Sequence, residues 1–108
     1  MLKFVKIGQQ NPPKREVVTR KEDFNEIYKE FINEKASEQS SRCSQCGVPF
    51  CQVHCPLSND IPDWLKLTAE GRLKEAYELS QSTNNMPEVC GRICPQDRLC
   101  EGNCVIEQ

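Results

Sequence analysis

The sequence lacks a long hydrophobic run and carries almost no net charge. Its first eighteen residues, MLKFVKIGQQNPPKREVV, contain no apolar stretch of signal-peptide length, and no later stretch approaches a transmembrane span. With 14 Lys and Arg against 16 Asp and Glu, the net charge is -2, so no basic surface for nucleic acid or an anionic membrane is indicated. We therefore expect a cytoplasmic chain that has neither nucleic acid nor a membrane as its partner.

Residues for catalysis by the chain alone are also scarce. There is one histidine, His54, and neither a G-x-S-x-G nor a G-x-G-x-x-G motif occurs. His54 directly precedes a cysteine, but we expect a polar loop residue here because the neighbouring thiols already supply enough donors for a metal. We expect no catalytic residue in this chain, so the chemistry it serves is done elsewhere.

Cysteine is what the sequence has in excess. Its 108 residues include eight cysteines, at positions 43, 46, 51, 55, 90, 94, 100 and 104. They form two runs that roughly mirror each other, C-x2-C-x4-C-x3-C-P and C-x3-C-P-x4-C-x3-C. In a reducing compartment such thiols bind metal or do redox chemistry more often than they form structural disulfides. A chain this short also needs an additional stabilising cross-link, such as a bound metal or disulfides, because its helical patterns bury only a small apolar core.

Three kinds of cysteine site could explain this pattern. A disulfide scaffold requires secretion, which the N-terminus does not indicate. Paired zinc sites usually repeat a short C-x2-C unit, and only Cys43 and Cys46 form one here. A 4Fe-4S cluster presents four outward iron corners, so three cysteines of one loop and a distant fourth can hold it. The spacing favours iron-sulfur.

A proline follows one cysteine of each run, at Cys55 and Cys94. In two-cluster ferredoxins, the cysteine before such a proline binds the other cluster, so the two runs are expected to cross. Nearby cations are Arg42, Arg92 and Arg98, which we interpret as surface arginines, with backbone N–H groups compensating most of the thiolate charge.

The remaining sequence predicts a mainly α-helical domain. The segment LKFVKI reads as a short N-terminal strand within an extended region over residues 1–18. A helix from a Thr19–Glu22 capping box to about Ser40 would place Phe24, Ile27, Tyr28, Phe31 and Ile32 on one apolar stripe, as core or as a docking face. Further helices are predicted from Pro62 to Gly71, from about Arg72 to Gln81, and from Pro87, with the cysteine loops at their ends.

The two cysteine runs together resemble a known family. The stretches SRCSQCGVPFCQVHCPLSNDIPDW and NNMPEVCGRICPQDRLCEGNC are similar to the N-terminal iron-sulfur domain of the glutamate synthase small (beta) subunit, which dihydropyrimidine dehydrogenase shares. The resemblance spans about Phe24 to the end. It implies an α-helical ferredoxin-like domain over residues 19–108 with two 4Fe-4S clusters, followed in the family by an FAD- and NAD(P)H-binding region.

The resemblance also implies a ligand set. It assigns four cysteines to the first cluster: Cys43, Cys46, Cys51 and Cys104. It assigns three to the second: Cys55, Cys94 and Cys100. The fourth ligand of the second cluster is a non-cysteine side chain in related proteins, beyond the second run. Cys90 is then a spare thiol, whereas counting thiols alone would recruit it as a metal ligand of the second site.

The function implied is an electron relay. The parent enzyme would oxidise NADPH at FAD and pass electrons through two 4Fe-4S clusters to the glutamate synthase large subunit. Because the glycine-rich nucleotide-binding turns of a complete small subunit are not found here, we expect a fragment. Alternatives are the same relay in a transhydrogenase-like or sulfide-dehydrogenase-like flavoprotein, and a zinc-stabilised module that only docks a partner.

Overall fold

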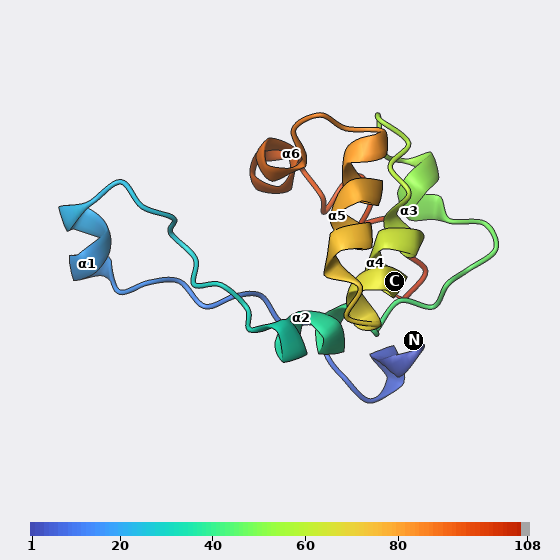
Figure 1. Ribbon diagram of the computed structural model, residues 1–108, viewed down its shortest axis with the longest axis horizontal. Helices are drawn as coiled ribbons and strands as arrows, with labels where there is room; N and C mark the ends of the chain where they lie inside the picture. The colour runs from blue at the N-terminus through green and yellow to red at the C-terminus, as the bar shows by residue number, and fades with distance from the viewer. Residues whose placement is uncertain (107–108) are drawn as a thin grey trace.

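The computed structural model describes residues 1–106 and is mainly helical, as the sequence predicts. A short 3-10 helix, η1, spans Lys3–Val5 (Figure 1). Six α-helices follow within the described residues: α1 (Val17–Glu22), α2 (Asn33–Ser40), α3 (Phe50–Val53), α4 (Ile61–Ala69), α5 (Leu73–Ser82) and α6 (Pro87–Ile93). Strand-like pairing within the described part of the chain is limited to one antiparallel bridge, between Lys14 and Tyr28.

Helix α4 is the centre of the helical body, because it contacts α5, α2 and α3. Pro62 lies in its first turn, where a missing N–H costs nothing. Its C-terminus is a Schellman motif, in which Gly71 N–H donates to the Thr68 carbonyl (3.1 Å) and Arg72 N–H to the Leu67 carbonyl (2.9 Å). Gly71 has φ +75°, which a glycine adopts without strain. The bounds predicted for α4, α5 and α6 are therefore confirmed to within one or two residues.

The single helix predicted from Thr19 to Ser40 is wrong. Helix α1 ends at Glu22, and Asp23 is extended, with φ -143° and ψ 175°. The Asp23 carboxylate accepts the N–H of Asn25 (2.9 Å), a local bond that competes with helical pairing. The expected capping box does not form either, because α1 begins at Val17, ahead of Thr19. The chain stays non-helical until α2 begins at Asn33.

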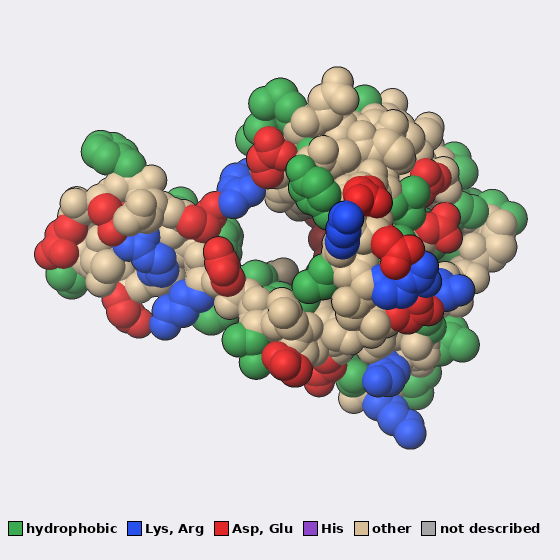
Figure 2. Space-filling view, viewed as in Figure 1, with side chains coloured by type: hydrophobic (Ala, Val, Ile, Leu, Met, Phe, Trp, Pro, Cys, Tyr) green, Lys and Arg blue, Asp and Glu red, His purple; other side chains and the backbone are tan. Residues whose placement is uncertain are grey.

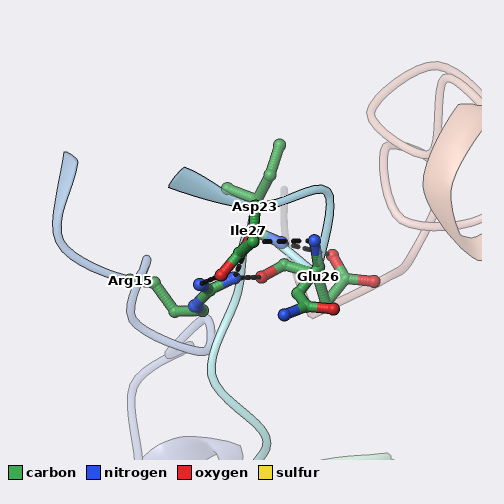
Figure 3. A network of polar contacts seen from close by, with 5 residues as sticks. Arg15, Asp23, Glu26 and Ile27 are labelled. Atoms are coloured by element: carbon green, nitrogen blue, oxygen red, sulfur yellow. Dashed lines mark hydrogen bonds and ion pairs between the residues drawn. The ribbon is translucent and has the colours of Figure 1, made fainter. Parts of the chain in front are cut away.

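Residues 11–32 form an arm that projects from the helical body and carries α1 near its tip (Figure 1). The two sides of the arm pair through Arg15 N–H to the Ile27 carbonyl and Lys29 N–H to the Pro13 carbonyl, both 2.8 Å. Arg15 also forms a bidentate pair with Asp23 (Figure 3). The apolar stripe is consequently not a core face: Phe24 is fully exposed, and Ile32 is 69% exposed.

The strand predicted over Leu2–Ile7 is also wrong, because the N-terminal segment (residues 1–8) has no neighbouring strand to pair with. Its backbone N–H groups bond the chain just before the first cysteines instead: Leu2 N–H donates to the Cys43 carbonyl and Lys3 N–H to the Ser41 carbonyl, both 3.0 Å. Arg42 Nε donates to the Ile7 carbonyl (3.0 Å). The segment thus lies along the first cysteine loop.

The apolar core is very small. Among the described residues the buried apolar ones are Ala76 and Pro62, and the buried polar ones are Ser40, Ser41 and Asn84. Charged side chains of both signs are interspersed over the visible face of the body and the arm (Figure 2). A body with so little buried apolar surface gains little from the hydrophobic effect alone.

Candidate metal centre

All eight cysteines line one cavity of about 710 Å³ inside the helical body. Each is a free thiol and each is partly buried, so no disulfide scaffold is formed by these cysteines. Cys51 lies in α3 and Cys90 in α6, and Cys94 caps the C-terminus of α6. The others lie in the loops next to these helices: Cys43, Cys46, Cys55, Cys100 and Cys104. The short helices α3 and α6 therefore bring cysteines of both runs to one cavity.

The thiols nearest to Cys51 come from both ends of the cysteine region. Burial raises the pKa of the Cys51 thiol to about 11, while the Gln52 N–H opposes this shift. The thiols of three other cysteines raise the pKa further, which places them close by: Cys104, Cys43 and Cys46. We call these four residues the first cysteine group. The structure thus brings together the four cysteines that the family resemblance assigns to one cluster; their binding of iron stays a prediction.

The remaining four cysteines form the second cysteine group: Cys55, Cys90, Cys94 and Cys100. Burial raises the pKa of the Cys94 thiol, and nearby Cys90 raises it further by its charge and by a hydrogen bond. The charge of Cys55 also raises the pKa of Cys94. Burial likewise raises the pKa of Cys100, against two backbone hydrogen bonds, with Cys55 again a neighbour. Cys90, which the family resemblance leaves spare, therefore lies beside a predicted ligand.

The donor set fits an iron-sulfur cluster. Among residues 1–106, no three Cys, His or carboxylate side chains converge closely enough to hold a single metal ion. The thiols line a cavity instead. A 4Fe-4S cube has four separate iron corners, so its ligands approach it from several sides. At neutral pH a thiol with a raised pKa is protonated, so binding of such a group must displace its proton.

The three arginines near the cysteines have other partners. Arg92 of α6 donates through Nε to the Glu26 carboxylate of the arm (2.7 Å). Arg98 has an 83% exposed side chain, with Nε 4.0 Å from Asp97. Arg42 bonds the N-terminal segment through the Ile7 carbonyl. Arg92 and Arg98 thus pair with carboxylates, whereas Arg42 also lines the thiol cavity.

His54 lies at the C-terminus of α3 with an exposed side chain. Its Nδ1 hydrogen-bonds the Phe50 carbonyl (2.9 Å), which can only accept, so this nitrogen carries the proton. This local bond accounts for the ring orientation without a metal.

The N-terminal segment is the part of the site that sequence reasoning missed. The segment bonds the Cys43 loop, and Gln9, which directly follows it, reaches the second run through a hydrogen bond to Glu101. Most of these bonds use backbone groups, which leave no pattern in a sequence. No signal in residues 1–8 could have found them.

None of the helices in the described part of the chain is long and apolar enough to cross a membrane.

Comparison with known proteins identifies the family. Residues 20–108 match the family described as dihydropyrimidine dehydrogenase domain II, 4Fe-4S cluster. The glutamate synthase [NADPH] small chain of Azospirillum brasilense is 72% identical over 108 residues, which are 100% of this chain and 22% of that protein. The corresponding protein of Escherichia coli K12 is 52% identical over 103 residues, or 95% of this chain and 22% of that protein.

A putative oxidoreductase of E. coli K12, AegA, is 48% identical over 96 residues, covering 88% of this chain and 15% of that protein. The chain thus spans about a fifth of the length of the glutamate synthase small chains that it matches. Such relatives support a role in electron transfer. Because the family match extends over most of the sequence and includes every cysteine of the cavity, the chain belongs to the 4Fe-4S cluster family of dihydropyrimidine dehydrogenase domain II.

Proposed function

We propose that this chain is a two-cluster electron-transfer domain. In this proposal the first cysteine group holds one 4Fe-4S cluster through Cys43, Cys46, Cys51 and Cys104. The second cluster is held by Cys55, Cys94 and Cys100. When bound, such clusters accept and release one electron at a time. The observation that carries the proposal is the gathering of eight free thiols, in two groups of four, around one cavity of about 710 Å³.

The contribution of the chain is to hold thiolates in a partly dry site and to limit the cost of their charge. Helix α3 and the loops at helix ends supply the sulfurs, and nearby backbone N–H groups offset negative charge, as Gln52 N–H does at Cys51. Partial burial of the thiols restricts contact with water. These features favour one-electron transfer over reaction of the site with solvent.

Cys90 is the fourth thiol of the second cysteine group. Its thiol lies close to the Cys94 thiol, whose pKa it raises. We propose that the native fourth ligand is a non-cysteine side chain outside this sequence, and that Cys90 substitutes for it only when that side chain is missing.

The wider role follows from the relatives. Since two of the relatives are named glutamate synthase [NADPH] small chains, we propose that this chain belongs to such an enzyme. There it would receive electrons from an NADPH-reduced FAD in the same parent chain and pass them to the large subunit, in the cytoplasm. A related NAD(P)H flavoprotein, as the match to a putative oxidoreductase allows, is the second candidate.

The proposal is tested by isolating the protein without oxygen and measuring iron, acid-labile sulfide, zinc and visible absorption. We expect a brown protein with broad visible absorption and matching iron and sulfide contents, enough for two clusters. A colourless protein that binds zinc instead would contradict the electron-transfer role and favour a zinc-stabilised docking module.

A further inference from the structure

Gln45 lies between Cys43 and Cys46 and donates two hydrogen bonds from its side-chain amide. Its Nε2 is 3.3 Å from the Sγ of Cys43 and 2.6 Å from the carbonyl oxygen of Pro62. The backbone N–H of Gln45 also points to the Cys43 sulfur, at 3.5 Å. One residue therefore supplies two N–H donors to a single thiol of the first cysteine group.

The orientation of this amide is fixed by its partners. A backbone carbonyl can only accept a hydrogen bond, so the amide nitrogen, and not the amide oxygen, must face Pro62. Pro62 lies in the first turn of α4, the central helix of the body. The second amide hydrogen is then left for the Cys43 sulfur. Gln45 has φ 52°, an uncommon backbone conformation outside glycine, which brings its own N–H and its side chain to the same sulfur.

Hydrogen bonds to the sulfur ligands of an iron-sulfur cluster are one of the factors that set its reduction potential. Reduction adds one negative charge, which is shared by the cysteine sulfurs. An N–H donor directed at such a sulfur stabilises the reduced form more than the oxidised form. A side-chain donor that is held in place by a second bond does this without reorganisation of the loop.

We propose that the Gln45 side chain raises the reduction potential of the cluster held by the first cysteine group, through its hydrogen bond to Cys43. The inference rests on the proposed function, since it needs a bound cluster. In it Gln45 is a positioning residue that acts through Cys43 and is not an iron ligand. This hydrogen bond makes the first cluster a better electron acceptor than it would be with an apolar side chain at position 45.

The test compares substitutions at Gln45 with matched substitutions at Gln52 in the intact, cluster-loaded protein. Gln45→Met removes the amide donors at similar length, and Gln45→Lys restores a donor. Gln52 is likewise the neighbour in sequence of a cysteine of the first group, but its Nε2 donates to Asp60 Oδ1 (2.7 Å) and to the Ser58 carbonyl (3.4 Å), away from sulfur. Gln52→Met and Gln52→Lys therefore control for loop stability and for added charge.

The readouts are iron content and the midpoint potential of each cluster, followed by paramagnetic resonance during redox titration. We expect Gln45→Met to lower the potential of the first cluster, with up to about a tenfold change in the reduced-to-oxidised ratio, equivalent to about 59 mV for one electron. Gln45→Lys should return the potential to the original value or above it, while Gln52→Met should leave it unchanged.

Iron retained at an unchanged potential in Gln45→Met would overturn this inference alone, leaving Gln45 as a tie between the loop and α4. So would a rise of the potential above the original value that is equal in Gln45→Lys and Gln52→Lys, since such a rise would trace to charge. If Gln45→Met does not retain iron, the Lys pair decides the question by itself. Absence of iron from the unsubstituted protein would instead overturn the proposed function, and this inference with it.

Discussion

At the scale of single residues, the chemistry of the site is that of crowded, partly buried thiols. The pKa of Cys51 is raised to about 11 by burial first and by the neighbouring thiols second. Cys94 and Cys100 shift in the same direction for the same reason. Without a bound cationic centre, these side chains are neutral at physiological pH. Cluster binding replaces thiol protons by iron, so the site is organised for a group that accepts several thiolates at once.

Cys90 gives a prediction at this scale. In a longer chain that continues past Gln108 as the relatives do, we expect Cys90→Ala to leave the iron content and the paramagnetic resonance signals nearly unchanged. The reason is that another side chain completes the second site. In the 108-residue chain alone, the same substitution should lower the iron content of the second group. Loss of the second cluster in the longer chain would make Cys90 a native ligand.

Some features of this site leave a pattern in the sequence, and others depend on contacts that only the fold creates. The two cysteine runs are visible as spacing, and the proline after Cys55 predicts that this cysteine binds the cluster of the other run, whereas no such mark follows Cys104. The role of Gln45 is not visible, since its amide is oriented by the Pro62 carbonyl, a backbone group seventeen positions away. Contacts of this kind depend on the fold and leave no local pattern.

At the scale of elements, helices with local start and stop signals were predicted well. Pro62, Gly71 and Pro87 mark the ends of α4, α5 and α6 in the sequence itself. The helix predicted from Thr19 failed because Asp23 is held by Arg15, from the other side of the arm. The apolar spacing that indicated a helix is real, but tertiary contacts determine the local structure there.

The turn between α4 and α5 gives a stability prediction. Gly71 has φ +75°, and a β-carbon placed there would meet no atom within 4 Å, so the cost of Gly71→Ala is backbone strain alone. We expect a loss of about 1 kcal/mol in the free energy of unfolding, measured by denaturant titration. Gly8→Ala is the matched control, because Gly8 has the same open space but no positive φ. Equal effects at the two glycines would contradict the strain argument.

The contact between the arm and α6 gives a pH prediction. Hydrogen bonding from Arg92 holds the pKa of Glu26 below its ordinary value of 4.5. A carboxyl group with a lowered pKa stabilises the folded contact above pH 4.5, and this stabilisation is lost as the pH falls through the lowered value. The effect is small because the pair is exposed.

We expect backbone NMR signals of the arm to change between neutral and acidic pH, and Glu26→Gln to reproduce the acidic state at neutral pH. Glu30→Gln, on the same arm, is the control. An arm whose signals do not respond to Glu26→Gln would show that the ion pair does not hold it against α6.

At the scale of the whole molecule, the body buries little apolar surface and contains a cavity lined by thiols. Ala76 and Pro62 are the only buried apolar residues among those described, and the cavity is lined by side chains from both cysteine runs. A metal group bound there would replace the missing core as the centre of the fold. The N-terminal segment adds bonds to the first run and Gln9 adds one to Glu101 of the second run, but these bonds are few.

Metal removal should therefore unfold much of the body. Complete chelation of iron is expected to lower the helical signal in circular dichroism and to remove hydrogen-exchange protection in α4 and α5. If both signals survive in protein shown to be free of iron and zinc, the helices hold themselves together, and the cluster is not the staple of the fold.

The crossed arrangement of the two cysteine runs is the central claim, and Cys104→Ser tests it most directly. Cys104 is the last cysteine of the chain, yet it is a neighbour of Cys51 in the first cysteine group. With Cys100→Ser as the comparison, paramagnetic resonance of the reduced protein should show loss or alteration of the first cluster in Cys104→Ser and of the second in Cys100→Ser. Damage by Cys104→Ser confined to the cluster of Cys94 and Cys100 would instead assign one cluster to each run and contradict the crossed arrangement.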